Sequence, residues 1–159
     1  MTRRRWRIGV ISDTHGLLRP EAVEALRGSD MIVHAGDIGS PEVLRGLETI
    51  APVVAVRGNN DREPWAKDLP LTDSFELGDA SIYVLHDVNE LDLDPRVAGF
   101  SVVIAGHSHQ PRSEERDGVL FFNPGSAGPR RFRLPISVGT IIIEGSRVTG
   151  LLKTLEIPT

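Results

Sequence analysis

Two histidines at the end of an apolar segment are the first residues in this sequence that suggest chemistry. Residues 102–105 (VVIA) are typical of a buried strand, and Gly106, His107, Ser108 and His109 follow them. Packing explains imidazoles at positions i and i+2 poorly. A metal ion explains them well, because imidazole nitrogen is a common ligand of divalent first-row metals. Two histidines cannot hold a metal alone, so we expect further ligands elsewhere in the chain.

Other apolar runs also end in polar side chains, namely Asp13 and His15 after 8–11, Asp37 after 31–35, Asn59 and Asn60 after 53–56, His86 after 81–85, and Asn123 after 119–122. In open α/β sheets the ligand site lies at the carboxyl ends of the strands. If these ends converge, they build one site from loops on a rigid scaffold.

The candidate ligands are two carboxylates, one amide and four imidazoles: Asp13, His15, Asp37, Asn59, His86, His107 and His109. This set is too large for one ion and suits two ions with one carboxylate between them. Nitrogen and oxygen ligands without sulfur favour manganese, nickel, iron, zinc or cobalt over calcium, and magnesium remains open. Two ions about 3.5–4 Å apart can clamp a phosphoryl oxygen and lower the pKa of a bridging water. The set therefore predicts phosphoryl chemistry.

The spacing of apolar residues predicts which elements carry these ends. Helices are expected at 20–27 and from 41 to about 51, and strands at 8–11, 31–35, 53–56, 102–105, 119–122, 138–143 and 147–152. Residues 74–77 and 81–85 are expected to form a hairpin, and 89–99 a loop. No element is predicted between His109 and Val119. Because the helices fall in the first half, we expect two packed mixed sheets with flanking helices rather than a regular βαβ array.

Composition limits the class of protein. A chain of 159 residues predicts one domain, 1–159, with its own core. The chain has no cysteine, which excludes disulfides and thiolate ligands and fits a cytoplasmic location. Its net charge of −4 argues against a general nucleic-acid surface. No apolar run approaches the roughly 20 residues of a transmembrane helix, so no membrane segment is expected.

The ordered motifs resemble those of the calcineurin-like metallophosphoesterases, and the chain's size resembles the small stand-alone prokaryotic phosphodiesterases of that superfamily. The motifs are Asp13-x-His15, Gly36-Asp37, Gly58-Asn59-x-Asp61, His86 and Gly106-His107-x-His109. They cover the chain from about residue 7 to 143, and residues 123–126 (NPGS) also resemble that subgroup.

This resemblance implies an α/β fold, a four-layer αββα sandwich of two mixed β-sheets flanked by helices. It also implies the distribution of ligands: Asp13, His15 and His109 on one metal, Asn59, His86 and His107 on the other, and Asp37 as the bridge. The implied activity is hydrolysis of small phosphodiesters by a metal-bridging hydroxide.

Two positions depart from the pattern. Many relatives have histidine where this chain has Asn60, and an amide cannot donate a proton near pH 7. We therefore expect weak general-acid help, activity on activated diesters, and a phosphate contact from Asn60. Asp87 stands where many relatives place glycine, and it either orients a ligand or faces solvent.

Three further residues are expected either to support the candidate ligands or to play no part in the site. His34 lies inside an apolar run and is expected to be a satisfied core residue or a partner of the ligands. Arg62 and Ser126 are near enough in sequence to contact phosphate, but solvated loops are the favoured interpretation.

Two other functions remain open besides the phosphoesterase. The eukaryotic retromer subunit resembles this fold and binds partner proteins, so an interaction scaffold is possible. All seven ligand positions here carry competent side chains, which favours the enzyme. A nuclease is disfavoured by the acidic net charge and by the lack of a basic, aromatic stripe. A homo-oligomer is left open.

Overall fold

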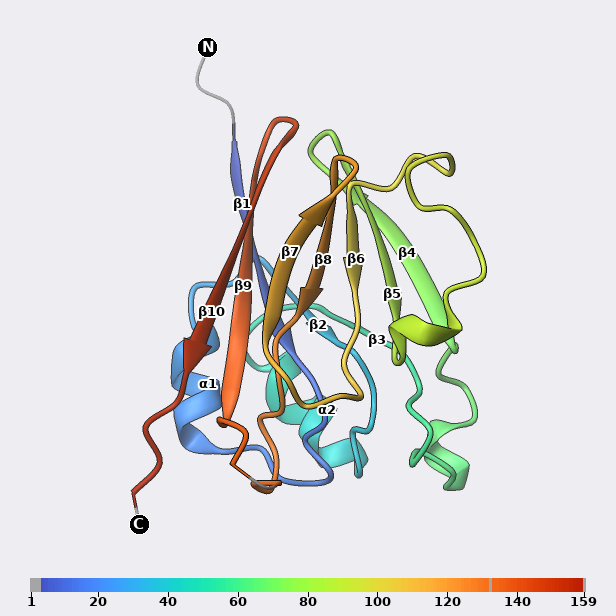
Figure 1. Cartoon of the computed structure of the whole chain (residues 1–159). Helices are drawn as coiled ribbons and strands as arrows, with labels where there is room; N and C mark the ends of the chain where they lie inside the picture. The colour runs from blue at the N-terminus through green and yellow to red at the C-terminus, as the bar shows by residue number, and fades with distance from the viewer. Residues whose placement is uncertain (1–3, 132, 159) are drawn as a thin grey trace.

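The fold consists of two five-stranded sheets that face each other, as the computed structural model shows (Figure 1). The structure describes residues 4–131 and 133–158. The first sheet has the order β10-β9-β1-β2-β3, with parallel pairing from β1 to β3 and antiparallel pairing of β9 with β1 and β10. Its strands are β1 (Arg5–Ile11), β2 (Met31–His34), β3 (Val53–Ala55), β9 (Ser137–Glu144) and β10 (Arg147–Thr154).

The second sheet is also mixed, with the order β4-β5-β6-β8-β7. Strands β5, β6 and β8 run parallel, and the two edge strands pair antiparallel. Its strands are β4 (Thr72–Leu77), β5 (Ala80–Leu85), β6 (Val102–Ile104), β7 (Arg112–Arg116) and β8 (Val119–Asn123). The expected pair of mixed sheets is therefore confirmed.

The central core fills the space between the sheets. Alternate residues of β1 serve its two faces: Ile8 and Val10 point to the second sheet, whereas Ile11 points to the helices. Phe122 of β8 fills the core from the other side. A Cβ at Gly139 would lie 2.4 Å from the Phe122 ring, so the glycine makes room for it.

Two short helices cover the outer face of the first sheet. They are α1 (Pro20–Leu26) and α2 (Pro41–Glu48), and both begin at a proline, as the sequence predicts. Leu26 and Leu47 pack with Ile11 and Ile32 in this layer. None of the helices within 4–131 and 133–158 is long and apolar enough to cross a membrane.

A loop covers the outer face of the second sheet. Val88 and Leu91, in and beside the 3₁₀ turn η2 (Val88–Glu90), pack on Leu85 and Val103. The fourth layer is thus a loop with one turn in the part of the chain that is described. A further 3₁₀ turn, η1 (Pro64–Ala66), lies in the connection before β4.

Strand β7 is an element that the sequence did not predict. Its residues, Arg112 to Arg116, read RSEER and carry no apolar alternation. They nevertheless pair with β8 along its whole length and form the edge of the sheet. Charged residues are tolerated there because an edge strand has neighbours on one side only, and they discourage pairing with other chains.

Candidate metal centre

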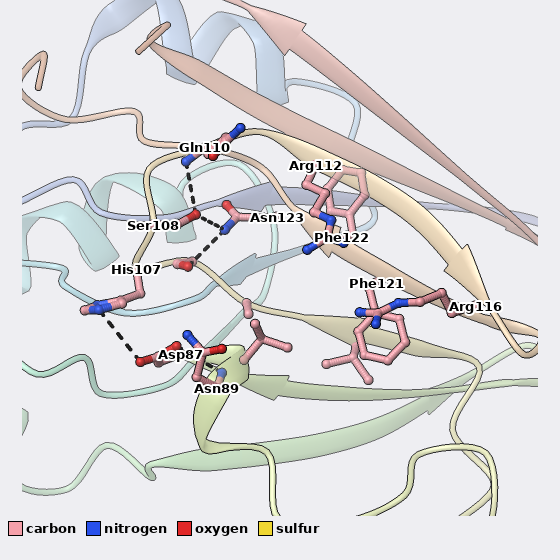
Figure 2. Close-up of a pocket in the computed structure, with 14 residues that line it drawn as sticks. Asp87, Asn89, His107, Ser108, Gln110, Arg112, Arg116, Phe121, Phe122 and Asn123 are labelled. Carbon is pink, nitrogen blue, oxygen red and sulfur yellow. Dashed lines mark hydrogen bonds and ion pairs between the residues drawn. The ribbon is translucent and has the colours of Figure 1, made fainter. Parts of the chain in front are cut away.

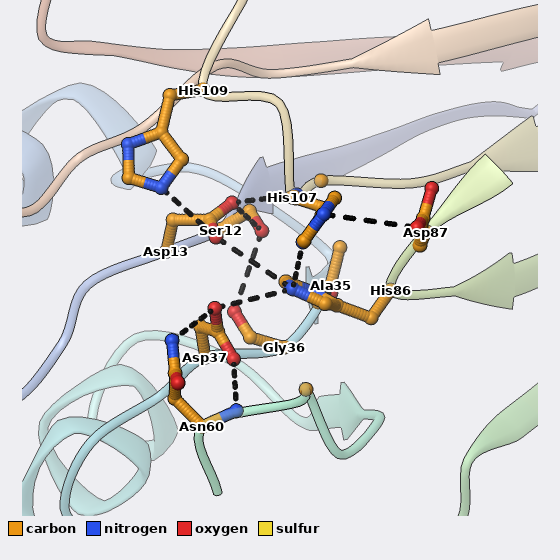
Figure 3. A network of polar contacts seen from close by, with 12 residues as sticks. Ser12, Asp13, Ala35, Gly36, Asp37, Asn60, His86, Asp87, His107 and His109 are labelled. Carbon is orange, nitrogen blue, oxygen red and sulfur yellow. Dashed lines mark hydrogen bonds and ion pairs between the residues drawn. The ribbon is translucent and has the colours of Figure 1, made fainter. Parts of the chain in front are cut away.

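The carboxyl ends of the parallel strands bring six of the seven expected ligands into two groups. Figure 3 shows five of these six side chains, all except His15. Asp13, His15 and His109 form one group, and Asp37, His86 and His107 form the other. Within each group one ligand atom per residue lies within 4.8 Å of the others. Segments far apart in the chain therefore meet at one edge of the two sheets.

Most of these ligands have a left-handed backbone. The φ angles are 56° for Asp13, 47° for His15, 57° for Asp37, 69° for His107 and 63° for His109. Each such residue costs of order 1 kcal/mol, and such strain clusters at functional sites. Hydrogen bonds between loops hold it in place, including Asp13 N to Gly36 O (3.0 Å) and His15 N to Asp37 O (2.9 Å).

One oxygen of Asp13 is held by the protein and the other is free. Oδ2 accepts hydrogen bonds from Ser12 Oγ (2.7 Å) and from the backbone N–H of His107 (3.0 Å). Oδ1 is buried without a hydrogen-bond partner and lies 3.4 Å from His109 Nε2. Burial alone would raise the pKa of Asp13, but the contacts with His109 and Ser12 outweigh it and hold the pKa below its usual value.

Unpartnered buried atoms concentrate in this first group. Of the four such side-chain atoms among residues 4–131 and 133–158, three are Asp13 Oδ1, His15 Nε2 and His109 Nδ1. A buried polar atom without a partner is rare and costly. A metal ion held between these side chains would satisfy Asp13 Oδ1 and His15 Nε2, and His109 faces Asp13 with its other ring nitrogen, Nε2. These nitrogen and oxygen donors fit a divalent first-row ion.

Asp37 reaches both groups. Its Oδ2 lies 3.2 Å from His86 Nε2 in its own group and 3.9 Å from His15 Nε2 in the other. Asn60 holds this carboxylate, since its backbone N–H donates to Oδ1 (2.9 Å) and its side-chain Nδ2 donates to Oδ2 (3.1 Å). Burial would raise the pKa of Asp37, but the contacts with His86 and Asn60 outweigh it and lower the pKa to about 2.

The tautomer of His86 is set by a backbone carbonyl. Nδ1 lies 2.7 Å from Ala35 O, which can only accept, so Nδ1 carries the proton in the neutral ring. The lone pair of Nε2 then points towards Asp37 and towards His107 Nδ1, 3.3 Å away. Burial lowers the pKa of His86, but the hydrogen bond to Asp37 and the charge of Asp13 outweigh it and raise the pKa to about 9.

Glycines let the loops approach each other. A Cβ at Gly36, where φ is 103°, would lie 2.6 Å from His86 Nδ1. A Cβ at Gly58 would lie 2.2 Å from Asp37 Oδ1. The glycines before Asp37 and Asn59 are therefore required by close contact.

Two expected participants lie beside the second group. Asn59 is exposed and lines a cavity of about 380 Å³ together with His86 and His107. Asp87 Oδ2 lies 3.7 Å from His107 Nε2, and its Oδ1 accepts the backbone N–H of Asn89. Of the two roles considered for Asp87, this position favours orienting the ligand.

The comparisons with known proteins agree with this geometry. The family model of the calcineurin-like phosphoesterase superfamily domain matches residues 6–146. The chain belongs to the calcineurin-like phosphoesterase superfamily. It is 39% identical over 153 residues to a probable metallophosphoesterase of Methanothermobacter thermautotrophicus, covering 89% of this chain and 88% of that one.

A further relative and a structural neighbour of this chain carry different names. A protein of Methanocaldococcus jannaschii named a phosphodiesterase is 33% identical over 137 residues, covering 75% of this chain and 82% of the other. The structure of vacuolar protein sorting 29 from Cryptosporidium parvum superimposes with a TM-score of 0.76, covering 96% and 99% of the two chains. Its identity of 19% shows the shared fold alone.

The carboxylate of Asp61 supports the candidate metal centre, and this role was not assigned from the sequence. Asp61 is 4% exposed. Its Oδ2 accepts the backbone N–H groups of Ile38 (3.1 Å) and Gly58 (2.9 Å), and its Oδ1 accepts that of Gly39 (3.1 Å). It therefore joins the loop of Asp37 to the loop of Asn59. Its place in the motif Gly58-Asn59-x-Asp61 was the available signal.

His34 supports the same loops from the core, as expected. The backbone N–H of Gly36 donates to its Nδ1 (3.1 Å), so Nε2 carries the proton and donates to Thr14 Oγ1 (3.0 Å). The Thr14 hydroxyl then donates to Ile38 O (2.8 Å). Complete burial lowers the pKa of His34 to about 4, so the ring is neutral near pH 7.

The prediction of a solvated loop is wrong for one of the residues Ser126 and Arg62 and correct for the other. The expectation of a solvated loop is wrong for Ser126, which is 4% exposed. Its hydroxyl donates to the backbone carbonyl of Asp13 (3.1 Å), so it supports that ligand's backbone. Arg62 is exposed as expected, and its Nε donates to the backbone carbonyl of Asn59 (3.1 Å).

Proposed function

We propose that this chain is a phosphodiesterase with two divalent metal ions. The observation that carries the proposal is that two unpartnered buried atoms, Asp13 Oδ1 and His15 Nε2, lie in one group with His109, whose Nε2 is 3.4 Å from Asp13 Oδ1. Beside them, the Asp37 carboxylate lies 3.9 Å from His15 Nε2 and 3.2 Å from His86 Nε2. One ion would be held by Asp13, His15 and His109, and the other by Asn59, His86 and His107. Asp37 would bridge them, and manganese is the favoured metal.

The bound ions would supply a water-derived nucleophile near neutral pH and would offset the negative charge of the phosphate. The protein's own residues prepare the site for this chemistry. Asn60 fixes both oxygens of Asp37, and Ala35 fixes the ring of His86. Ser12 holds Asp13 Oδ2 and leaves Oδ1 without a hydrogen-bond partner. Such fixed ligands lose little freedom when the metals bind.

Asn60 also defines a limit of the proposed reaction. Its amide carries two N–H donors, of which one serves Asp37 and the other is available to a phosphate oxygen. It cannot protonate a leaving group, so activated diesters should react best. Asn60→His should raise turnover of diesters with poor leaving groups relative to bis(p-nitrophenyl) phosphate. An unchanged ratio would contradict this account.

Two cavities beside the site favour a diester over a monoester. Both are bounded by His107 and Asp87. One, of about 240 Å³, extends over β7 and β8 (Figure 2), and the other, of about 380 Å³, extends past Arg57 to Leu71. A phosphodiester has two ester arms, and the site offers one space for each. The Methanocaldococcus relative named a phosphodiesterase supports the same choice.

The test is hydrolysis of bis(p-nitrophenyl) phosphate and p-nitrophenyl phosphate by metal-stripped protein with single metals added back. We expect diester turnover that depends on metal, is highest with manganese among manganese, nickel, iron, zinc, cobalt and magnesium, and is lost in Asp37→Asn. Asp68→Asn is the matched control, because Asp68 is an exposed carboxylate in the connection before β4.

Other outcomes of this test would assign the protein to a different functional class. Turnover of the monoester alone would make the protein a phosphatase. Bound metal without turnover of either ester would favour an interaction scaffold. Steeply salt-dependent oligonucleotide cleavage would favour a nuclease.

A further inference from the structure

We propose that the groove over β7 and β8 binds a second phosphate, carried by one ester arm of the substrate, through Arg112. The inference rests on the proposed phosphodiesterase function and narrows its substrate to phosphodiesters with a phosphorylated, nucleotide-sized arm.

The groove starts at the candidate metal centre. His107 and Ser108 form its near end, and Arg112, Arg116 and Phe121 lie further along it (Figure 2). Its volume of about 240 Å³ has room for part of a small organic ligand but not for a large one. An ester arm of a phosphate held at His107 would therefore have to enter this groove or the cavity on the opposite side.

Arg112 is tied to the ligand loop through one residue. It is the ladder partner of Asn123 in the pairing of β7 with β8. The side chain of Asn123 donates to Gly106 O (2.9 Å) and to Ser108 Oγ (3.1 Å), on either side of His107. The strand that carries the arginine is thereby fixed relative to the metal ligands. Its side chain is 54% exposed and accessible to a ligand.

The charges at the end of the groove that lies away from Asp87 and His107 favour an anion (Figure 2). Arg112 and Arg116 both pair with a single carboxylate, Glu114, with 3.7 Å between Arg116 Nε and Glu114 Oε1. Two guanidinium groups and one carboxylate leave one positive charge. Arg116 also stacks on the Phe121 ring at 4.6 Å, which orients it. An arginine presents a fork of N–H donors that matches phosphate oxygens.

The lining of the groove suits a sugar or a ring. Val103, Ala105 and Phe121 supply apolar surface, and Gln110 and Asn123 supply polar groups. Small-molecule sites combine an apolar lining with a few placed polar groups in this way. An arm with a flat or sugar-like part and a phosphate can use both kinds of group.

The experiment compares two substrates that differ only in the second phosphate. They are the p-nitrophenyl ester of thymidine 5′-phosphate and the same compound with an added 3′-phosphate. Both release p-nitrophenol, so the reaction and leaving group are identical. In the manganese-loaded protein we expect a KM about tenfold lower for the doubly phosphorylated compound, as one charge-assisted contact would give.

Three variants test the residue. Arg112→Gln should remove the KM difference between the two compounds. Glu114→Gln should increase the difference, because it removes the competing carboxylate. Arg147→Gln on β10, with the same change of charge elsewhere, should have no effect. Equal KM values in the wild type, or a difference that persists in Arg112→Gln, would overturn the inference.

Calorimetric binding separates this inference from the proposed function. Thymidine 3′,5′-bisphosphate and thymidine 5′-phosphate are titrated into the same protein. If the bisphosphate binds about tenfold more tightly and Arg112→Gln abolishes the difference, the groove is an anion site even if no diester is hydrolysed. Equal binding of the two probes would refute the groove site, and diester hydrolysis would then stand alone.

Discussion

The Nδ1 atom of His86 lies 2.7 Å from the carbonyl oxygen of Ala35, two residues before Asp37. This contact fixes the ring so that Nε2 faces the Asp37 carboxylate at 3.2 Å. In the metal-free protein a proton occupies the space between them, because the acidic neighbours raise the pKa of His86 to about 9. A metal ion bound to Nε2 has to displace that proton.

The first prediction is that metal binding releases a proton. At pH 7.5, calorimetric titration of manganese in buffers of different ionisation enthalpy should show about one proton released from His86 per protein. Apparent affinity should rise about tenfold per pH unit up to about pH 9 and then level off. Affinity that is constant between pH 6.5 and 9 would contradict this role of His86.

The contact between His86 and Asp37 also makes the stability of the metal-free fold depend on pH. The pKa of His86 is raised above its ordinary value of 6.5, so the contact stabilises the metal-free fold fully below about pH 6.5. That contribution is lost as the pH rises through about 9. Chelator-treated protein should therefore unfold at lower urea concentration at pH 9.5 than at pH 7, and added manganese should reverse the difference.

The second prediction concerns Asp61, which accepts three backbone N–H groups from the loops of Asp37 and Asn59. Asp61→Asn replaces one acceptor oxygen by an NH₂ group that faces a donor. Urea unfolding should show a loss of about 2–3 kcal/mol, the cost of a buried charge-assisted contact. Manganese affinity should also fall, because both loops carry proposed ligands. Asp68→Asn, at an exposed position, should change neither the free energy of unfolding nor the manganese affinity. An unaltered manganese affinity in Asp61→Asn would show that the loops hold their positions without Asp61.

Most strands and both helices could be predicted from the sequence, because buried positions carry apolar residues in a recognisable pattern. Short runs of apolar residues marked β1 and β9, and proline marked the starts of α1 and α2. Strand β7 could not be predicted, because its side chains are polar, mostly charged, and only its backbone pairs with β8. The sequence predicts an element when side chains are buried, and predicts it poorly when the backbone alone supports it.

The candidate ligands could be proposed from the sequence, whereas the groups that support them could not. Asp13, His15 and His109 have the donor atoms of metal ligands, so residue type and spacing point to them. The carbonyl of Ala35 supports the site through a backbone atom that every residue has. The left-handed backbone of the ligands likewise follows from hydrogen bonds between distant loops. Such supports become visible only when the loops are seen together.

The third prediction is a loss of stability in acid that comes from His34. The buried ring stays neutral in the folded chain because its pKa is lowered to about 4, whereas the unfolded chain takes up a proton near 6.5. Stability is therefore lost as the pH falls from 6.5 to 4, by up to about 3 kcal/mol. Urea unfolding of metal-free protein at pH 7 and 4.5 measures this. His34→Gln should be less stable at pH 7 but should lose less on acidification, and an equal loss would assign the effect to other groups.

The fourth prediction tests whether close approach of the loops positions the metal ligands. A Cβ at Gly58 would lie 2.2 Å from both the backbone nitrogen and Oδ1 of Asp37, and Asn60 holds that carboxylate in place. Gly58→Ala should cost about 1–3 kcal/mol in urea unfolding through overpacking. It should also weaken manganese binding at least about tenfold, as changes next to metal ligands do.

Gly46→Ala in α2 is the matched control. Its Cβ would meet only the end of the Leu18 side chain, which can move aside, and alanine is favoured over glycine in a helix by about 1 kcal/mol. This variant should be as stable as the wild type or more so, with unchanged manganese affinity. If Gly58→Ala bound manganese as tightly as Gly46→Ala, the Asp37 carboxylate would have to be mobile in the folded protein. A fixed position of Asp37, the proposed bridge between the two groups of candidate ligands, would then be ruled out.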